Sequence, residues 1–229
     1  MSLAGAQILV ALASDEDGGI TAALRALGCR ILPASSGEAA LSLARTNLPD
    51  LVLLDLQLPG LDGLTVCKEL RRDAGTAHMP VFIVSAQDNA MDRLLAFELG
   101  ADEFLLRSCP PRELGARVRN FLGRLRPEQP VPPRPPAAGF VVDAEAHQAI
   151  VRGREVPLTP TEIKLLSALL EHPGQVWTRQ RLLQAAWPGA EFATERTVDT
   201  HIRRLRVKLG SARNCIRTVR NAGYAFRTL

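Results

Sequence analysis

The sequence lacks the patterns that are typical of disulfide-stabilised, zinc-binding or membrane-spanning proteins. Its four cysteines, Cys29, Cys67, Cys109 and Cys215, form no Cys-x-x-Cys pair, and none of its four histidines lies at ligand spacing from a cysteine or another histidine. No apolar run approaches the ~18 residues that a membrane helix requires. We therefore expect structural thiols, no metal site and no membrane segment.

A signal peptide is not predicted either. The apolar run from Leu3 to Ala13 has no basic residue before it, because the first one is Arg25, and polar residues 14–17 follow at once. This run is expected to be a buried strand. The protein is expected to be soluble and cytoplasmic.

Proline is concentrated in one stretch, 125–139, which reads LRPEQPVPPRPPAAG. This density favours extended polyproline II and excludes a helix or a central strand. We predict a semi-rigid linker at 126–139 between domains at 1–125 and 140–229, because 229 residues suffice for two modest cores. The alternative, a proline-rich ligand for an SH3-like partner, fits less well in a chain that reads as bacterial.

Charge differs between the predicted domains. Residues 1–125 carry 12 basic and 15 acidic side chains, a net charge of −3, whereas residues 140–229 carry 14 and 8, a net charge of +6. A basic domain attached to a mildly acidic one suits a DNA-binding half and a control half.

Apolar runs alternate with helical patterns in the first domain. Strands are expected at 7–12, 29–34, 50–56, 80–86 and 103–107, and helices at 20–27, 37–47, 62–73, 89–100 and 111–125. Apolar runs that do not alternate with polar residues, such as 51–54 and 81–84, indicate parallel strands that are buried on both faces. The pattern predicts an α/β doubly wound five-stranded parallel sheet, in which sites form beyond the carboxyl ends of the strands.

The residues at those strand ends are Leu12, Ala13, Asp55, Ser85 and Arg107. A carboxylate such as Asp55, next to a turn, is placed to act as a nucleophile toward a phosphoryl donor. The alternative is a carboxylate that only caps the turn.

The stretch 195–209, ERTVDTHIRRLRVKL, predicts an amphipathic helix. Val198, Ile202, Leu205 and Leu209 form one apolar stripe that would dock on a core. The opposite face carries Arg196, Thr200, Arg203, Arg204 and Val207, flanked by Arg206, Asp199, His201, Lys208 and Thr197. Such a face suits a major groove, where arginine bonds guanine and methyl groups contact thymine. The alternative is a solvated cationic surface.

A hairpin is predicted directly after this helix. Residues 211–214 form a turn, and 216–226 (IRTVRNAGYAF) read as two short strands around Asn221, Ala222 and Gly223. Beside a groove-reading helix, this hairpin would be a wing that brings Arg217 and Arg220 to phosphates or to a minor groove.

The start of the second domain predicts short antiparallel strands and two capped helices. The strands fall within 139–157, with turns at 143–144 and 152–153. Thr159 is the predicted N-cap of the next helix, with Pro160 and Glu162 at its first and third positions. Thr178 is the predicted cap of a second helix.

The helix and hairpin motifs together resemble the C-terminal winged-helix effector domain of the OmpR/PhoB family of two-component response regulators. The first domain resembles that family's CheY-like receiver domain. Asp55 matches the phosphoacceptor, 58–63 the loop that follows it, Ser85 the phosphoryl-binding residue, Phe104 the switch aromatic, and 100–103 the turn before the fifth strand. The resemblance implies a DNA-binding transcription regulator and not an enzyme.

The resemblance also implies roles for the basic residues. Thr200 and Arg204 would read bases, Arg220 would enter the minor groove, and four residues would hold phosphates: Arg196, Thr197, Arg203 and Arg206. A dimer would read tandem half-sites in double-stranded DNA, roughly 10–10.5 bp apart. The connection 187–194 would contact RNA polymerase, with a core role as the alternative for Trp187.

A homodimer is the expected assembly. In the family, the fourth helix, fifth strand and fifth helix of the receiver pair across a two-fold axis, and Arg93, Glu103, Glu113 and Arg117 match the charged positions used. Exposed ion pairs contribute only ~0–1 kcal/mol each, so they select the partner face more than they drive association.

The receiver motif departs from the family at the strand ends. Leu12 and Ala13 stand where the family has the acidic pair that holds Mg²⁺, so no cofactor is expected. Arg107 replaces a lysine, and Ser108 replaces a proline. We expect output that does not depend on phosphorylation of Asp55.

Two alternatives remain for the receiver. One is conventional phosphorylation by a histidine kinase, with Mg²⁺ held by Asp15, Glu16 or Asp17. The other is a phosphate-sink or autophosphatase receiver.

Overall fold

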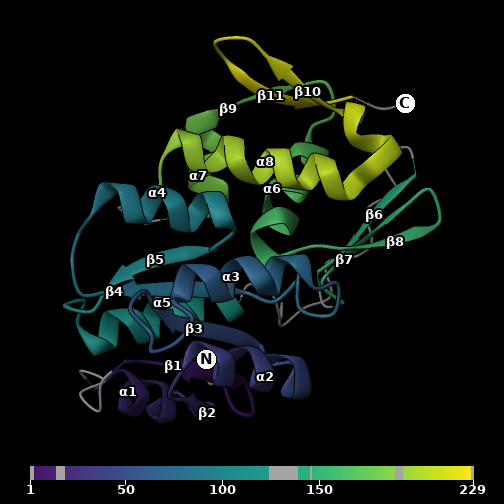
Figure 1. The fold of residues 1–229 in the computed structure, drawn as a ribbon. Coiled ribbons are helices and arrows are strands. Elements are labelled where there is room, and N and C mark those ends of the chain that lie inside the picture. The colour runs from purple at the N-terminus through teal and green to yellow at the C-terminus, as the bar shows by residue number, and fades with distance from the viewer. Residues whose placement is uncertain (1–2, 14–18, 124–138, 145, 189–192, 228–229) are drawn as a thin grey trace. The chain divides into compact units, whose positions relative to one another are not determined.

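A computed structural model describes residues 3–13, 19–123, 139–144, 146–188 and 193–227. The chain forms two compact units, Met1–Arg126 and Pro127–Leu229 (Figure 1). Within the described ranges, no helix is long and apolar enough to cross a membrane. The predicted linker falls almost wholly outside the described ranges.

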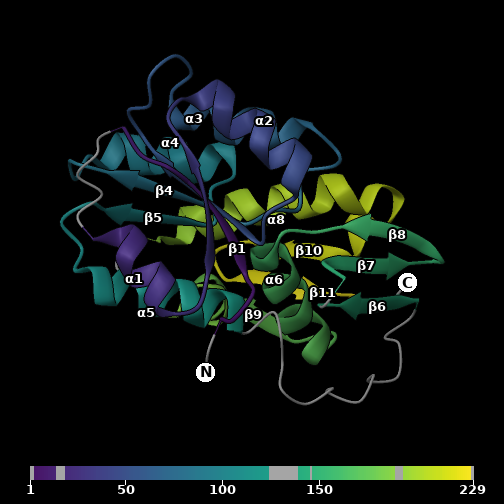
Figure 2. The same cartoon turned by 90° about the horizontal axis from the view of Figure 1, so that it is seen from below.

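The first unit is the predicted five-stranded parallel sheet, and the order of its strands is β2-β1-β3-β4-β5. Its elements in chain order are β1 (Gln7–Ala11), α1 (Ile20–Ala26), β2 (Arg30–Ala34), α2 (Gly37–Asn47), β3 (Leu51–Asp55), α3 (Gly63–Arg72), β4 (Val81–Ser85), α4 (Ala90–Leu99), β5 (Glu103–Leu106) and α5 (Pro111–Gly123). Figure 2 shows α1 and α5 on one face of this sheet and α2, α3 and α4 on the other.

The central strands of this sheet are buried on both faces, as their unbroken apolar runs indicate. Every residue of β3 and β4 is buried. Phe82 of β4 packs edge-to-face on Phe121 of α5, with ring centroids 5.0 Å apart. Because the strands are parallel, Ala13, Asp55 and Arg107, each at or just beyond the carboxyl end of its strand, come to one edge of the sheet.

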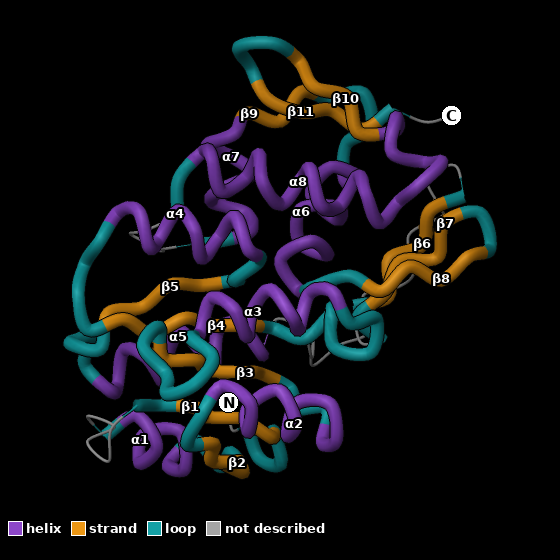
Figure 3. The backbone as a smooth tube through the Cα atoms, in the orientation of Figure 1, coloured by secondary structure: helices purple, strands orange, loops and turns teal. Residues whose placement is uncertain are grey.

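The second unit is a winged helix. Its elements are β6 (Phe140–Asp143), β7 (Gln148–Val151), β8 (Arg154–Pro157), α6 (Pro160–Glu171), β9 (Val176–Thr178), α7 (Arg179–Ala186), α8 (Glu195–Leu209), the 3₁₀ helix η1 (Gly210–Cys215), β10 (Ile216–Val219) and β11 (Gly223–Phe226). Strands β6, β7 and β8 form an antiparallel sheet, and β10-β11-β9 form another (Figure 3).

Local sequence signals determine several of these boundaries. The predicted capping box at α6 is present, with the Thr159 N–H donating to Glu162 Oε2 (2.8 Å) and the Glu162 N–H donating to Thr159 Oγ1 (3.3 Å). Thr178 caps α7 by accepting the Arg181 N–H at 3.2 Å. Arg152 and Gly153 both have positive φ, as a two-residue turn between antiparallel strands requires.

The sequence did not predict β9, which fixes the base of the hairpin. Gly223 of β11 pairs with Thr178 of β9 so closely that a Cβ at Gly223 would lie 2.0 Å from the Trp177 carbonyl oxygen. Only glycine permits this approach. The hairpin is therefore held to the strand that precedes α7.

Candidate nucleic-acid interface and receiver pocket

The apolar stripe of α8 docks the helix on the core, as predicted. Val198, Ile202 and Leu205 have no exposed surface, and Leu209 is 4% exposed. Beside the stripe, Lys208 donates to Glu162 Oε2 of α6 at 2.8 Å. These contacts fix which side of α8 faces outward.

The outward face of α8 is narrower than the sequence predicted. Arg196 and Arg203 are exposed, Arg204 is half-buried and Val207 is 75% exposed. Thr200, the expected base reader, is only 9% exposed. A projection of the helix alone placed Thr200 on the open face, because it ignores the elements that pack beside the helix.

Thr197, an expected phosphate contact, is also buried, at 3% exposure. Its hydroxyl oxygen accepts the Thr194 N–H at 3.0 Å, which closes the first turn of α8. The sequence pattern assigned this side chain to DNA, whereas the structure uses it as half of a capping box.

Arg206 fastens α8 to the hairpin. Its Nε and Nη2 donate to the Ile216 carbonyl at 3.1 and 2.7 Å, and Nη2 also donates to Thr218 Oγ1 at 2.8 Å. The sequence placed Arg206 among the phosphate contacts, but most of its donors are already directed at β10. Arg217 and Arg220 of the hairpin are exposed, as expected of a wing.

Asp199 makes a second connection between α8, α7 and the hairpin. Its Oδ1 accepts both the Tyr224 hydroxyl (2.7 Å) and Arg179 Nε (2.8 Å). The guanidinium groups of Arg179 and Arg206 lie over the Tyr224 ring, 5.2 and 5.4 Å from its centroid. We name Arg179, Asp199, Arg206 and Tyr224 the α8–wing lock; the sequence reasoning missed it, and the one available signal was an acidic residue within a basic helix.

The contacts of the lock raise the pKa values of two of its residues, Tyr224 and Arg179. Burial, followed by the hydrogen bond to Asp199, raises the pKa of Tyr224 to about 12. The hydrogen bond to Asp199 also raises the pKa of Arg179. Both shifts indicate that the lock is held with a neutral Tyr224 phenol and a charged Arg179.

Trp187 packs within the second unit. It is 3% exposed, and its ring meets His201 of α8 edge-to-face at a centroid distance of 5.1 Å. Residues 189–192 of the connection expected to contact RNA polymerase lie outside the described part of the chain.

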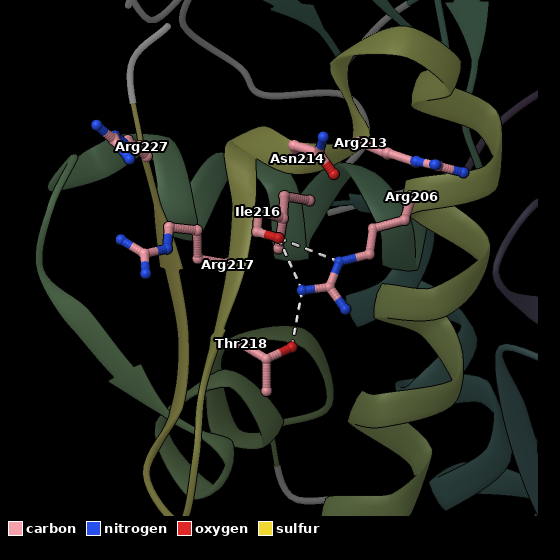
Figure 4. Close-up of a pocket in the computed structure, with 7 residues that line it drawn as sticks. All are labelled: Arg206, Arg213, Asn214, Ile216, Arg217, Thr218 and Arg227. Carbon is pink, nitrogen blue, oxygen red and sulfur yellow. Dashed lines mark hydrogen bonds between the residues drawn. The ribbon is translucent and has the colours of Figure 1, made fainter.

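A shallow groove of about 600 Å³ lies between the carboxyl end of α8 and the hairpin (Figure 4). It is lined by Arg206, Arg213, Asn214, Ile216, Arg217, Thr218 and Arg227. The sequence analysis did not single out Arg213 or Arg227.

In the first unit, the structure brings Asp55, Ala13 and Arg107 together, as the strand order implied. Asp55 is 1% exposed; its Oδ1 accepts the Gln57 N–H at 3.0 Å, and its Oδ2 accepts the Ala13 N–H at 3.2 Å and pairs with Arg107 Nη2. The carboxylate charge is therefore compensated within the chain. Arg107 supplies the cation.

The described pocket residues do not fit a magnesium ion. The Leu12 and Ala13 side chains have no oxygen, and no group of three or more His, Cys, Asp and Glu side chains within the described ranges could hold a metal. Asp15, Glu16 and Asp17 lie outside those ranges. The Asp55 carboxylate is in contact with a guanidinium instead.

The residues expected to take part in switching, Ser85 and Phe104, lie on the neighbouring strands β4 and β5. The Ser85 hydroxyl donates to the Gln87 carbonyl at 2.8 Å and accepts the Gln87 N–H at 3.2 Å, so it forms a turn after β4. Phe104 has no exposed surface.

The charged residues of the expected dimer face pair mostly within the unit. Arg117 Nη2 lies 2.8 Å from Glu113 Oε1 on α5, and Arg93 Nη2 lies 2.7 Å from Asp88 Oδ1. Glu103 is 7% exposed. Its neighbour Asp102 is fully buried and pairs with Arg71 at 2.9 Å.

A receiver-type α/β unit joined to a winged helix with an arginine-bearing helix defines the class of this protein, a DNA-binding transcriptional response regulator. Comparison with known proteins supplies the family. Residues 17–119 match the response regulator receiver domain, and residues 153–226 match the C-terminal domain of transcriptional regulatory proteins. The chain belongs to the OmpR/PhoB family of two-component response regulators, a family of regulators and not of enzymes.

Similar proteins cover most of the chain. The transcriptional regulatory protein BaeR of Escherichia coli is 39% identical over 193 residues, which are 83% of this chain and 79% of BaeR. The phosphate regulon transcriptional regulatory protein PhoB of Pseudomonas aeruginosa is 35% identical over 213 residues, 91% of each chain. A mutant of RitR shares the fold over 98% of this chain and all of its own, with a TM-score of 0.71 at 22% identity.

The titration of Tyr224 tests the lock, because this is the only tyrosine in the sequence. Tyrosinate absorbance, read promptly after jumps to alkaline pH, is expected to have its midpoint near 12 in the native protein. The folded pKa lies above the unfolded value of about 10, so this stabilisation is complete below pH 10 and is lost as the pH rises toward 12.

The urea-unfolded chain is the control for this titration and should show a midpoint near 10. Asp199→Asn should lower the native midpoint, because it removes the negative charge beside the phenol. A native midpoint near 10 would show that Tyr224 does not make this contact in solution.

Proposed function

We propose that this protein is a sequence-specific transcription regulator whose receiver works without phosphorylation of Asp55. The single observation that carries this proposal is the ion pair between Arg107 and Asp55. Phosphoryl transfer to a carboxylate needs a divalent cation to offset the charge of the arriving group and to orient it. Here a fixed guanidinium covers one carboxylate oxygen, and Leu12 and Ala13 stand at the positions of the metal ligands.

Incubation with acetyl phosphate and Mg²⁺, followed by intact-mass measurement, tests this proposal. We expect no gain of a phosphoryl group. The triple variant Leu12→Asp, Ala13→Asp, Arg107→Lys restores the family residues and is the positive control. It should gain one phosphoryl group, and the further change Asp55→Asn should abolish that gain.

A stoichiometric gain by the unaltered chain would overturn the phosphorylation-independent receiver. It would favour conventional phosphorylation by a histidine kinase, with metal ligands from Asp15, Glu16 or Asp17. Phosphorylation without any specific DNA binding would favour a phosphate sink.

The receiver is proposed to form a homodimer without a phosphoryl signal. The face is that of α4, β5 and α5, with Arg93, Glu103, Glu113 and Arg117. Exposed Met91 and Leu95 on α4 support it, since they offer apolar area beside the charged positions. Sedimentation equilibrium of the unphosphorylated chain should show dimers, and a monomer at high micromolar concentration would contradict this proposal.

The winged helix is proposed to bind double-stranded DNA at tandem half-sites in the cytoplasm, with RNA polymerase contacted by the connection 187–194. Arg204 and Thr200 are assigned to bases and Arg220 to the minor groove. The residues assigned to phosphates are Arg196, Thr197, Arg203 and Arg206. The exposure of Arg196 and Arg203 supports their assignment most strongly, whereas Thr197, Thr200 and Arg206 would need part of their surface freed.

Two arginine variants separate base reading from phosphate binding. Arg204→Ala should cost about 1–3 kcal/mol on the selected site and relax specificity at one or two base pairs. Arg203→Ala should weaken binding to all sequences alike and reduce the dependence on salt. Fluorescence anisotropy on a selected duplex and a random duplex gives both quantities, and equal losses on both duplexes for both variants would refute this division.

A further inference from the structure

The last turn of α8 presents one apolar side chain to solvent. Val207 is 75% exposed, more than any other large apolar side chain in the described ranges. A β-branched residue also lowers helix propensity, and at this position no burial in the core offsets that cost. Single exposed apolar side chains are common on protein surfaces, so the surroundings of Val207 have to show whether it has a function.

The two residues next to Val207 in the sequence are fastened to the rest of the winged helix. Arg206 donates to the Ile216 carbonyl of β10 at 3.1 and 2.7 Å, and Lys208 donates to Glu162 of α6 at 2.8 Å. At 100° per residue, Val207 points between these two directions and nearly opposite the apolar stripe of α8. The last turn is therefore held in place by its charged side chains, while its valine faces outward.

Val207 lies on the face of α8 that carries the proposed DNA contacts. It follows Arg203 by four residues and Arg204 by three, the two spacings that make side chains neighbours on a helix. Arg203 is exposed and Arg204 is half-buried. A duplex that reaches these two arginines therefore also reaches the methyl groups of Val207.

The chemistry of Val207 distinguishes between the bases. Its side chain has neither a hydrogen-bond donor nor an acceptor. In the major groove, guanine, adenine and cytosine present hydrogen-bonding groups, whereas thymine also presents its C5-methyl group. A valine placed over a polar base edge would leave donors or acceptors of that base unpaired, which costs free energy. Thymine is therefore the base that suits this side chain.

We propose that Val207 is a specificity-determining residue that selects a thymine by contact with its C5-methyl group. This inference rests on the proposed DNA-binding function. Val207 lies three residues beyond Arg204, which is ~4.5 Å along the helix axis. Successive base pairs are ~3.4 Å apart. The selected thymine should therefore lie within one or two base pairs of the base that Arg204 reads.

Replacement of single thymines by deoxyuridine in a selected duplex tests the proposal, because each replacement removes one methyl group and keeps every hydrogen-bonding group. The full chain should lose about 3- to 4-fold in affinity at one thymine, the effect expected of one buried methyl group. That thymine should lie within two base pairs of the position at which Arg204→Ala relaxes specificity. Fluorescence anisotropy on the series of duplexes measures each affinity.

Two variants of Val207 connect this effect to its side chain. Val207→Ser removes the methyl groups and should bind the thymine and deoxyuridine duplexes equally. Val207→Ile is the matched control, which keeps an apolar side chain and should keep the preference for thymine. Neither variant changes a charge, so the slope of log K against log salt should stay the same. An unchanged tryptophan emission spectrum shows that the winged helix is folded, because both tryptophans lie in it.

The other outcomes decide against the proposal in different ways. If no deoxyuridine within two base pairs of the Arg204 position weakens binding, or if Val207→Ser keeps the preference for thymine, Val207 does not read a methyl group and the proposed function stands. If Val207→Ser keeps its affinity for every duplex and yet lowers transcription in a reconstituted system, the partner of Val207 is a protein. If the unaltered chain binds no duplex, both proposals fail.

Discussion

The carboxylate of Asp199 is the constraint on which the winged helix depends. One oxygen atom accepts the Tyr224 hydroxyl and Arg179 Nε, which joins α8 to the hairpin and to α7. Arg206 adds bonds to β10, and its guanidinium and that of Arg179 cover the Tyr224 ring. An acidic residue in the middle of a basic helix would weaken DNA binding by its charge alone. Arg179 compensates the negative charge of Asp199. Asp199 therefore orients α8 relative to the wing and weakens the positive potential of this surface only slightly.

A carboxylate paired with an arginine has a different consequence in the receiver unit. Asp55 is buried and accepts two backbone N–H groups besides its contact with Arg107. In a phosphorylatable pocket such a carboxylate has to approach a phosphoryl group with the help of a dication. With Leu12 and Ala13 as neighbours, the arginine supplies the compensating charge, and the pocket resembles a closed structural ion pair. A carboxylate–arginine pair therefore fixes the position of α8 in the winged helix. In our proposal, a second such pair prevents phosphorylation of Asp55 in the receiver unit.

Local patterns in the sequence predicted most of the fold, because periodicity and capping are short-range properties. The parallel sheet, the apolar stripe of α8 and the capping box at Thr159 all follow from residues within a few positions of one another. The features that the sequence did not predict are tertiary. The burial of Thr200, the attachment of Arg206 to β10 and the pairing of Asp199 with Tyr224, 25 residues away, depend on segments that meet only after folding. A helical projection assigns such polar side chains to the open face, whereas the structure uses several of them to hold its elements together.

The contacts of Asp199 and Arg206 make α8 and the hairpin one preformed unit. The most direct test is a structure of the winged-helix unit, bound to a duplex selected from random sequence, compared with the free unit. We expect α8, β10 and β11 to superpose within about 1 Å of Cα r.m.s.d. and the bond from Tyr224 to Asp199 to remain near 2.7 Å. A hairpin that swings away from α8, with Asp199 released to contact DNA, would contradict the account.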